Sequence, residues 1–511
     1  MVEVTLIGVI CLIACVLVAV RPMDWGLLIF GLFLPLQTAA AFNLWAVGGV
    51  SIICSHLIIG AFMVGLAFRP KMASAVLRDV SGRPAVFIFG LFVLYAVVSA
   101  IILPRLFEGS IDVYSLERAP DGVRRAIPLV NLHPTTGNLT QSVYMTANFA
   151  LFAFLAFAIA RANGVRNAMI MLNAATVTHL IFGALSVLYA VAPVAVILET
   201  IRTANYAILQ HHTMGGLARV IGSYAEASAF GSMSLGLFAY NALRFLQTRG
   251  LWFLVSSLSL IAAVIFSFST TAYAGLALMV LLWSLHTSFV LIRRGLKGDQ
   301  LVGFFLCIAI AAAVVFLLLF EPSRAFADQL YLRLFGQKLQ SASGVERSMW
   351  NMQGLRNLIE SGGLGVGLGS ARTSSLVTVL LSNVGVFGAL LYAAFLGASF
   401  LKPWPKRLRP TSSPGEFRAQ RMFAATRAGA IAMLITHIIA GGNIDGGLQF
   451  FVFAATAAGV CAAPRRKLST QSQSLFPVGE KFLFPPQPAM EFQQRPQTRF
   501  LFARARESES G

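Results

Sequence analysis

Residues 85–103 read AVFIFGLFVLYAVVSAIIL, an apolar run of nineteen residues without a charged side chain. The hydrocarbon core of a bilayer is about 30 Å thick, and an α-helix needs about 20 predominantly apolar residues to cross it. A basic residue and a proline flank the run on each side, Arg83-Pro84 before it and Pro104-Arg105 after it. This stretch is therefore predicted to be a transmembrane helix.

Similar apolar stretches recur along the whole chain. We count thirteen, and none of the 39 basic or 20 acidic residues lies inside them, as the cost of an intramembrane charge requires. They cover residues 4–20, 25–41, 48–68, 85–103, 143–160, 168–191, 227–243, 251–267, 272–292, 302–320, 376–401, 428–440 and 448–461. The last two are short enough to pair as a hairpin that does not fully span. The pattern predicts an all-α polytopic integral membrane protein with 12–13 transmembrane helices.

The composition excludes an ordinary soluble globular protein. Of the 511 residues 57% are hydrophobic and 12% are charged, and the mean hydropathy is +0.75, whereas soluble domains carry about 25% charged residues. The polytopic domain is predicted to cover residues 1–463. The remainder, 464–511, is rich in Gln, Ser, Pro and Arg, a composition typical of a disordered tail.

The net charge of +19 is distributed by loop. Short loops near residues 21–24, 69–83, 161–166, 244–249, 293–299 and 402–427, together with the tail, hold 27 basic and eight acidic residues, and the other loops hold 12 of each. Basic loops face the cytoplasm, so we predict a cytoplasmic tail, and an odd number of spans puts the N-terminus outside. The charge then indicates an anionic bilayer as the partner and no nucleic acid.

Three loops on the predicted outer side, about 104–142, 192–226 and 321–375, are much longer than helix connections need to be. Long loops on a rigid scaffold commonly carry chemistry. The spans show no inverted repeat and no mid-membrane charge, which counts against a secondary transporter. The five cysteines lie in or at the ends of apolar stretches and form no zinc-ligand spacing, so no metal site is predicted.

In the loop 192–226, Arg219 and Glu226 lie seven residues apart at the start of an apolar stretch. A cation there can bind a substrate phosphate, and a carboxylate can accept a proton from an acceptor hydroxyl. The alternative is structural: Arg219 extends to the membrane interface and Glu226 caps the helix start. The pair His211-His212 is a reserve candidate for substrate contact, although a solvated loop explains it equally simply.

The loop 321–375 carries a predicted amphipathic helix. Ser343-Gly-Val-Glu346 has the pattern of a capping box, and a helix is expected from there to about Glu360. Its apolar residues recur at helical spacing, whereas Arg347 and Arg356 lie off that stripe. The stripe consists of Met349, Met352, Leu355 and Ile359. We expect this helix to lie flat on the outer membrane surface with its arginines exposed.

Glycines follow that helix at alternate positions, Gly365, Gly367 and Gly369, and Arg372 lies just before the next apolar stretch. Backbone N–H groups exposed by such glycines before a helix N-terminus form an anion-binding surface. A flexible hinge is the alternative interpretation. The pattern is not a dinucleotide fingerprint, because no strand precedes it and no βαβ unit surrounds it.

The order of these features resembles the bacterial O-antigen polymerase and ligase superfamily. The similarity lies in Arg347-Ser-Met-Trp350, the amphipathic helix, Gly365-Val-Gly-Leu-Gly-Ser370 and Asn383-Val-Gly385-Val-Phe-Gly388. The upstream segment from Arg219 through Gly222-Ser-Tyr-Ala-Glu226 to Phe230 is similar to an earlier motif of that superfamily. The predicted topology, with a large outer loop before the last few spans, also resembles it.

The resemblance implies a GT-C-like membrane glycosyltransferase at the periplasmic face of a bacterial inner membrane. Its donor would be a glycan on undecaprenyl diphosphate, used without a metal or other cofactor, and a chain-length regulator is a conceivable partner. It implies Glu226, Arg219 and Arg347 as catalytic residues, because planar arginines suit a diphosphate leaving group. The substrate-binding candidates are Arg356, Arg372, Gly365, Gly367, Gly369, Tyr224, Trp350, His211 and His212.

One departure separates the two activities of that superfamily. Ligases that transfer finished O-antigen to the lipid A core are expected to carry a histidine near the position of Ser374, and residues 321–375 contain no histidine. The absence favours a polymerase of repeat units for O-antigen or exopolysaccharide. A ligase remains one alternative, and a flippase or transporter of lipid-linked oligosaccharide is another.

Overall fold

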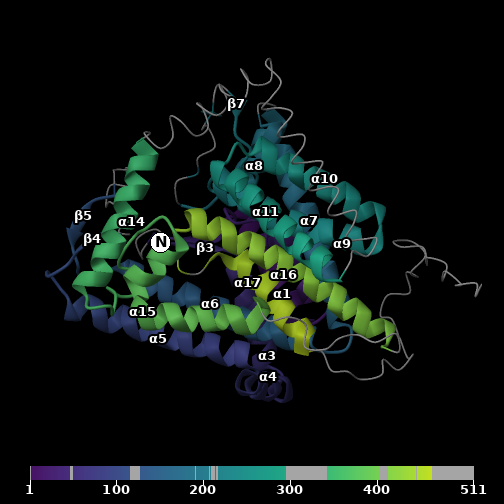
Figure 1. Ribbon diagram of the computed structural model, residues 1–511, viewed down its shortest axis with the longest axis horizontal. Coiled ribbons are helices and arrows are strands. Elements are labelled where there is room, and N and C mark those ends of the chain that lie inside the picture. The colour runs from purple at the N-terminus through teal and green to yellow at the C-terminus, as the bar shows by residue number, and fades with distance from the viewer. Residues whose placement is uncertain are drawn as a thin grey trace, which may run out of the picture. The chain divides into compact units, whose positions relative to one another are not determined.

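The computed structural model describes residues 2–45, 50–115, 127–189, 192–205, 208, 213–214, 217–294, 342–401, 412–442, 444 and 446–462. Residues 1–465 form one compact unit, and its described part is mostly helical (Figure 1). The predicted tail, 464–511, and the predicted tenth span, 302–320, lie outside the described residues.

The helices are long relative to the few short strands. They are α1 Leu6–Val20, α2 Trp25–Phe33, α3 Cys54–Ala67, α4 Pro70–Gly82, α5 Pro84–Leu106, α6 Thr136–Ile159, α7 Gly164–Val187, α8 Ala192–Ile201, α9 Ala227–Thr248, α10 Leu251–Phe266, α11 Thr270–Arg294, α14 Ala342–Glu360, α15 Leu376–Leu396, α16 Pro414–Ala440 and α17 Leu448–Ala462. A π-helical turn, Gly397–Leu401, continues α15.

The described residues also form three small antiparallel sheets. The first has the order β1 Val2–Val4, β2 Ala40–Leu44 and β3 Val50–Ile53, with Val2 opposite Leu44 and Ala40 opposite Ile53. The others are the ribbons β4 Asp112–Tyr114 with β5 Leu129–Asn131, and β6 Thr213–Met214 with β7 Leu217–Ala218. Each strand has five residues or fewer, so the sheets join helix ends and form no layer.

Six described helices are long and apolar enough to cross a membrane: α5, α6, α7, α11, α15 with its π-helical turn, and α16. A seventh span arises if α3 and α4, which bend by 112° at their junction, count as one. Shorter apolar helices are α1, α10 and α17. The chain is thus an all-α, multi-pass membrane protein in its described part, as the apolar stretches predict.

The predicted boundaries were wrong in three spans. The second and third, 25–41 and 48–68, are helical only in α2 and from Cys54 onward, because Ala40 and its neighbours pair as strands. The twelfth is not a short hairpin arm but the end of the 27-residue helix α16. Its first half carries Arg418 and Arg421, which lowered its hydropathy and concealed it.

Loops predicted to share a side of the membrane make contacts with one another. On the basic face, the Arg69 guanidinium donates to the carbonyls of Ala19 and Val20, and that of Arg83 donates to Ala156. On the opposite face, Thr38 donates to the carbonyl of Ser223, and the Arg372 amide donates to Tyr114. These contacts join segments that the charge pattern assigns to the same face.

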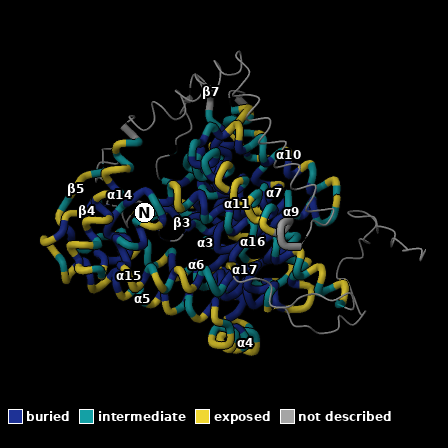
Figure 2. The backbone as a smooth tube through the Cα atoms, in the orientation of Figure 1, coloured by how far each residue is buried: buried dark blue, intermediate teal, exposed yellow. Residues whose placement is uncertain are grey.

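The core is a stack of aromatic rings where α5 meets α6, α15 and α17. The centre of the Phe89 ring lies 4.4 Å from the ring centre of Phe395, 4.9 Å from that of Phe451 and 5.4 Å from that of Phe152. Nearly every residue of α17 is buried, whereas exposed residues are frequent on α4 (Figure 2). A helix that is apolar all round is a central helix, and α17 occupies that place.

Candidate functional site

The segment that leads into α9 is hydrogen-bonded to two other segments, one after α2 and one after α8. The Ser223 hydroxyl donates to the carbonyl of Pro35 (2.7 Å), and the Ser223 carbonyl accepts from Thr38. The Arg202 guanidinium donates to the carbonyl of Gly222 (2.7 Å). Gly222 has a φ of +56°, and an added Cβ would lie 2.9 Å from the ring of Phe230. The positions of the neighbouring polar side chains are therefore set by tertiary contacts.

Tyr224, in the same segment, is buried. Its side chain is 2% exposed, its hydroxyl lies 3.4 Å from Nδ1 of His179, and its ring packs edge-on against Phe230. The other nitrogen of His179, Nε2, lies 2.7 Å from the hydroxyl of Ser234 on α9. The structure thus places Tyr224 in a buried network rather than on an open surface, and the sequence analysis did not single out His179.

Glu226 occupies the N-cap position of α9 with extended backbone, but its side chain makes no capping hydrogen bond. Its carboxylate instead accepts a hydrogen bond from the hydroxyl of Ser228. The residue is only half-buried. The structural alternative is therefore correct in position but not in hydrogen bonding.

Arg219 lies between β7 and α9, with its Nε 3.4 Å from the carbonyl oxygen of Ser267. Burial lowers the pKa of the Arg219 guanidinium, and the carboxylate of Glu226 acts in the opposite direction. Tyr273 also raises this pKa, whereas the positive charge of Arg347 lowers it. Arg219 is thus within electrostatic range of Glu226, which comes from the same motif, and of Arg347, which comes from a helix far along the chain.

A second contact joins Trp350, which lies on the same helix as Arg347, to Arg372, which lies in the segment before α15. The Arg372 guanidinium lies 4.9 Å from the centre of the Trp350 ring, and Trp350 is 8% exposed. The Arg372 amide donates to the carbonyl of Tyr114 in β4 (2.9 Å). A cation over an indole face is a stabilising arrangement. It joins the middle of α14 to the segment before α15.

Helix α14 follows the predicted pattern with two corrections, its start and Arg347, which is half-buried rather than exposed. It begins at Ala342, so Ser343 lies inside the first turn and does not precede it as an N-cap. The apolar stripe is exposed, from 40% at Leu355 to 77% at Ile359, and Arg356 is also exposed. The polar face is turned inward, where the Gln353 amide donates to the carbonyl of Asp112 (2.8 Å).

The glycine-rich segment is not the exposed anion-binding surface that its spacing predicts. Its glycines at 365, 367 and 369 are buried, and the amides within it donate to protein acceptors. Gly367 donates to the carbonyl of Asn383 (2.8 Å), and Val366 donates to that of Ser382 (2.8 Å). Ala371 donates to the side chain of Asn383 (3.1 Å). The hinge interpretation is also wrong, because the segment is buried and hydrogen-bonded.

The same glycines have a different role, which is close packing. Their φ values are +83°, +99° and +82°, a region that other residues rarely adopt. A Cβ at Gly367 would lie 2.7 Å from the side chain of Pro104, and one at Gly369 would lie 2.6 Å from the carbonyl oxygen of Gly137. The segment is therefore held against the ends of α5 and α6.

The two histidine candidates, His211 and His212, lie outside the described residues. Within the described ranges, no group of three or more His, Cys, Asp or Glu side chains is placed to hold a metal ion. Comparison with known protein families, curated proteins and solved structures found no match for this chain. The functional assignment therefore rests on Arg219, Arg347 and Glu226.

Proposed function

We propose that this protein is a membrane glycosyltransferase that polymerises undecaprenyl-diphosphate-linked oligosaccharide repeat units into exopolysaccharide or O-antigen. The proposal places it in a bacterial inner membrane with its active side facing the periplasm. The observation that carries it is the position of Arg219, which lies beside Ser267 before α9 and is acted on by the charges of both Glu226 and Arg347. Two cations and one carboxylate at the outer end of the helices match a reaction in which a diphosphate leaves and a hydroxyl is deprotonated.

The proposed reaction assigns each group one step. An acceptor hydroxyl attacks the anomeric carbon of the donor, a new C–O bond forms, and the bond from that carbon to the phosphate oxygen breaks. The hydroxyl proton passes to the carboxylate of Glu226. The departing undecaprenyl diphosphate keeps the electron pair, and Arg219 and Arg347 stabilise its added negative charge. Partial burial of Arg219 strengthens this interaction, because charges attract more strongly where water is excluded.

The test of the proposed function is to disrupt the gene and to analyse the lipid-linked intermediates. Under the proposal, cells accumulate single repeat units on undecaprenyl diphosphate in the outer leaflet and make no long polymer. Long polymer that accumulates on undecaprenyl diphosphate would instead identify a ligase. Repeat units confined to the cytoplasmic leaflet would identify a flippase, and either result would overturn the proposal.

Replacing Glu226 by glutamine is expected to slow polymerisation by about 10²–10⁴-fold, the range that a positioned general base contributes. The amide keeps the shape of the side chain and can still contact Ser228, but it cannot take a proton. Turnover of purified lipid-linked repeat units by the reconstituted protein measures the effect. Glu360→Gln is the matched control, because Glu360 is an exposed glutamate at the end of α14. A wild-type rate in Glu226→Gln would remove Glu226 from the mechanism.

A further inference from the structure

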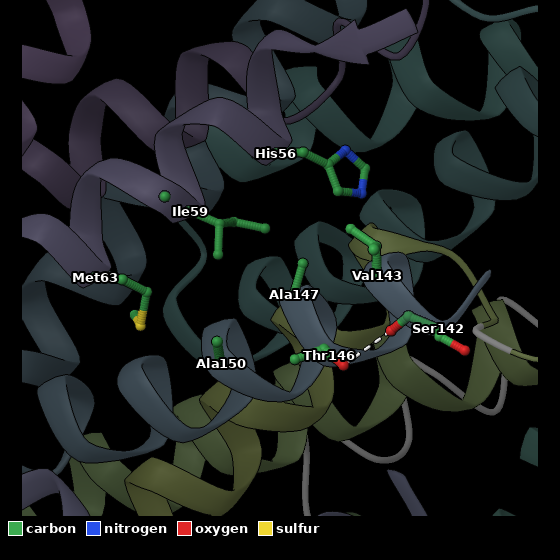
Figure 3. Close-up of a pocket in the computed structure, with 9 residues that line it drawn as sticks. His56, Ile59, Met63, Ser142, Val143, Thr146, Ala147 and Ala150 are labelled. Atoms are coloured by element: carbon green, nitrogen blue, oxygen red, sulfur yellow. Dashed lines mark hydrogen bonds between the residues drawn. The ribbon is translucent and has the colours of Figure 1, made fainter. Parts of the chain in front are cut away.

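A depression of about 440 Å³ lies between α3 and α6 (Figure 3). Its lining is mostly apolar, from Ile59 and Met63 on α3 to Val143 and Ala150 on α6, and none of its lining residues is a candidate site residue. The polar group that contacts the segment around Glu226 directly is buried elsewhere, on α7. It is the imidazole of His179.

His179 contacts both sides of the turn that carries Glu226. The imidazole is fully buried (0% exposed). On one side of the turn, its Nδ1 lies 3.4 Å from the hydroxyl of Tyr224. On the other side, its ring stacks on that of Phe230, with ring centres 4.5 Å apart and an interplanar angle of 15°. One imidazole therefore connects the segment before Glu226 to the first turn of α9.

The ring of Phe230 is closely packed against α7. An added Cβ at Gly183, one turn after His179, would lie 2.9 Å from this ring, and one at Gly222 would lie 2.9 Å from it as well. The two glycines thus leave the space that the ring occupies. Because protein interiors are close-packed and transmit a change in volume, a change at the imidazole would displace Phe230 and the start of α9 with it.

The hydrogen bonds of His179 determine which of its nitrogens carries the proton. The Ser234 hydroxyl donates to the carbonyl of Phe230 (2.9 Å), so Nε2 of His179, 2.7 Å from that hydroxyl, must be the donor to it. His179 forms no ion pair with any described residue, and a buried charge without a partner is costly. The imidazole is therefore neutral, and Nδ1 accepts from the hydroxyl of Tyr224.

We infer that His179 is a positioning residue that fixes the carboxylate of Glu226 at the start of α9, by contacting Tyr224 before it and Phe230 after it. This inference rests on the proposed function, in which Glu226 takes the proton of the acceptor hydroxyl. His179 is fully buried, so it acts through these neighbours and not on a substrate. A general base must lie within hydrogen-bond reach of the proton that it takes, and a displacement of about 1 Å can cost about 10²-fold in rate.

Replacing His179 by glutamine tests the inference. Glutamine can still donate to Ser234, but it offers neither an acceptor at the position of Nδ1 nor a ring that stacks on Phe230. We expect turnover of purified lipid-linked repeat units by the reconstituted full-length protein to fall by about 10–10²-fold. In a Glu226→Gln background, the same substitution should lower the remaining rate by less than about twofold, because the carboxylate that it misplaces is already absent. Equal losses in the two backgrounds would identify a purely structural role and overturn the inference.

Hydrogen exchange of the same variant measures the order of this turn without an assay of activity. The amides of Tyr224 and Phe230 donate to the carbonyls of Ile221 (3.1 Å) and Glu226 (3.2 Å). We expect peptides that cover residues 220–230 to exchange about tenfold faster in His179→Gln, and unchanged exchange would overturn the inference. Failure of the proposed function appears elsewhere, in the lipid-linked intermediates of the gene disruption, so the two failures are distinguishable.

Thr176→Val is the matched control. Thr176 is a fully buried residue of α7, and its hydroxyl accepts a hydrogen bond from the side-chain amide of Asn241 (3.2 Å), toward the C-terminal end of α9. The substitution therefore removes another buried hydrogen bond between the same two helices, away from Glu226. Its turnover, and its exchange in residues 220–230, should match the wild type. Losses equal to those of His179→Gln would assign both effects to general destabilisation and contradict the inference.

Discussion

Cells that carry Arg219→Ala or Arg347→Ala are expected to make no long polymer while they retain normal amounts of the protein. Each arginine is assigned to the leaving diphosphate, and the loss of one such charge-stabilising donor costs about 2.7–4 kcal/mol of transition-state stabilisation, or about 10²–10³-fold in rate. Both side chains act on the same charge, so the double variant should not be the simple product of the single effects. Electrophoresis of cell-surface polysaccharide, with immunoblotting of the protein, measures the result.

Arg78→Ala is the control for this experiment. Arg78 is an exposed arginine on α4 at the basic face, so its removal changes the net charge equally without touching the candidate site. Arg219→Lys is a graded variant, because it keeps the charge but loses the planar fork that contacts two phosphate oxygens at once. Full-length polymer in the Arg219→Ala, Arg347→Ala double variant would eliminate the proposed mechanism.

Gly365→Val is expected to prevent stable folding of the outer segments. At a φ of +83°, the added Cβ would lie 2.7 Å from the backbone nitrogen of Gly385 and 2.8 Å from the carbonyl of Asn383. Backbone atoms cannot rotate away, and a β-branched residue is strained at positive φ. The two effects together should cost more than about 4 kcal/mol. The midpoint of thermal unfolding of the purified protein in detergent and its yield measure the loss.

Gly362→Asn is the matched control for this substitution. Gly362 lies in the same segment and has a φ of +61°, but nothing lies within 4 Å of the position of its Cβ. Asparagine tolerates the left-handed region better than most residues, so the control should unfold close to the wild-type temperature. If Gly365→Val also unfolded there, the packing role assigned to the glycines would be wrong.

These contacts give a physical reason for two motifs that the sequence presents separately. Gly385 interrupts α15 with a φ of +64°, and its added Cβ would lie within 2.5 Å of backbone atoms of Gly363 and Leu364. The Asn383 side chain donates to the carbonyl of Ala371 (2.9 Å) and accepts from its amide (3.1 Å). The glycine-rich segment and the first half of α15 are thus one interlocked unit. Glycine spacing alone is compatible with a nest, a hinge or such packing.

The positions of many membrane-spanning helices were predictable from hydropathy, because apolar side chains favour the hydrocarbon of the bilayer over water. An uncharged run such as 85–103 must be a helix, since every backbone group in hydrocarbon needs an internal partner. The boundary predictions failed in two situations: where backbone groups pair in a sheet instead of a helix, and where charged side chains lower the hydropathy of a helix. Residues 40–44 pair in a sheet, and the first half of α16 carries arginines that reduce its hydropathy. The capping box at Ser343 was wrong by less than one turn.

For the candidate site too, some features follow from the sequence and others only from the tertiary structure. Composition alone determines that the chain is a multi-pass membrane protein, since this follows from the free energy of each residue in water or hydrocarbon, and the loop charges predict its two faces. The tertiary structure alone decides which polar groups meet. It brings Arg347 and Glu226 into range of Arg219, turns Tyr224 inward onto His179, and occupies the amides near Gly367 with internal hydrogen bonds. Such contacts depend on packing between distant segments, which residue spacing does not encode.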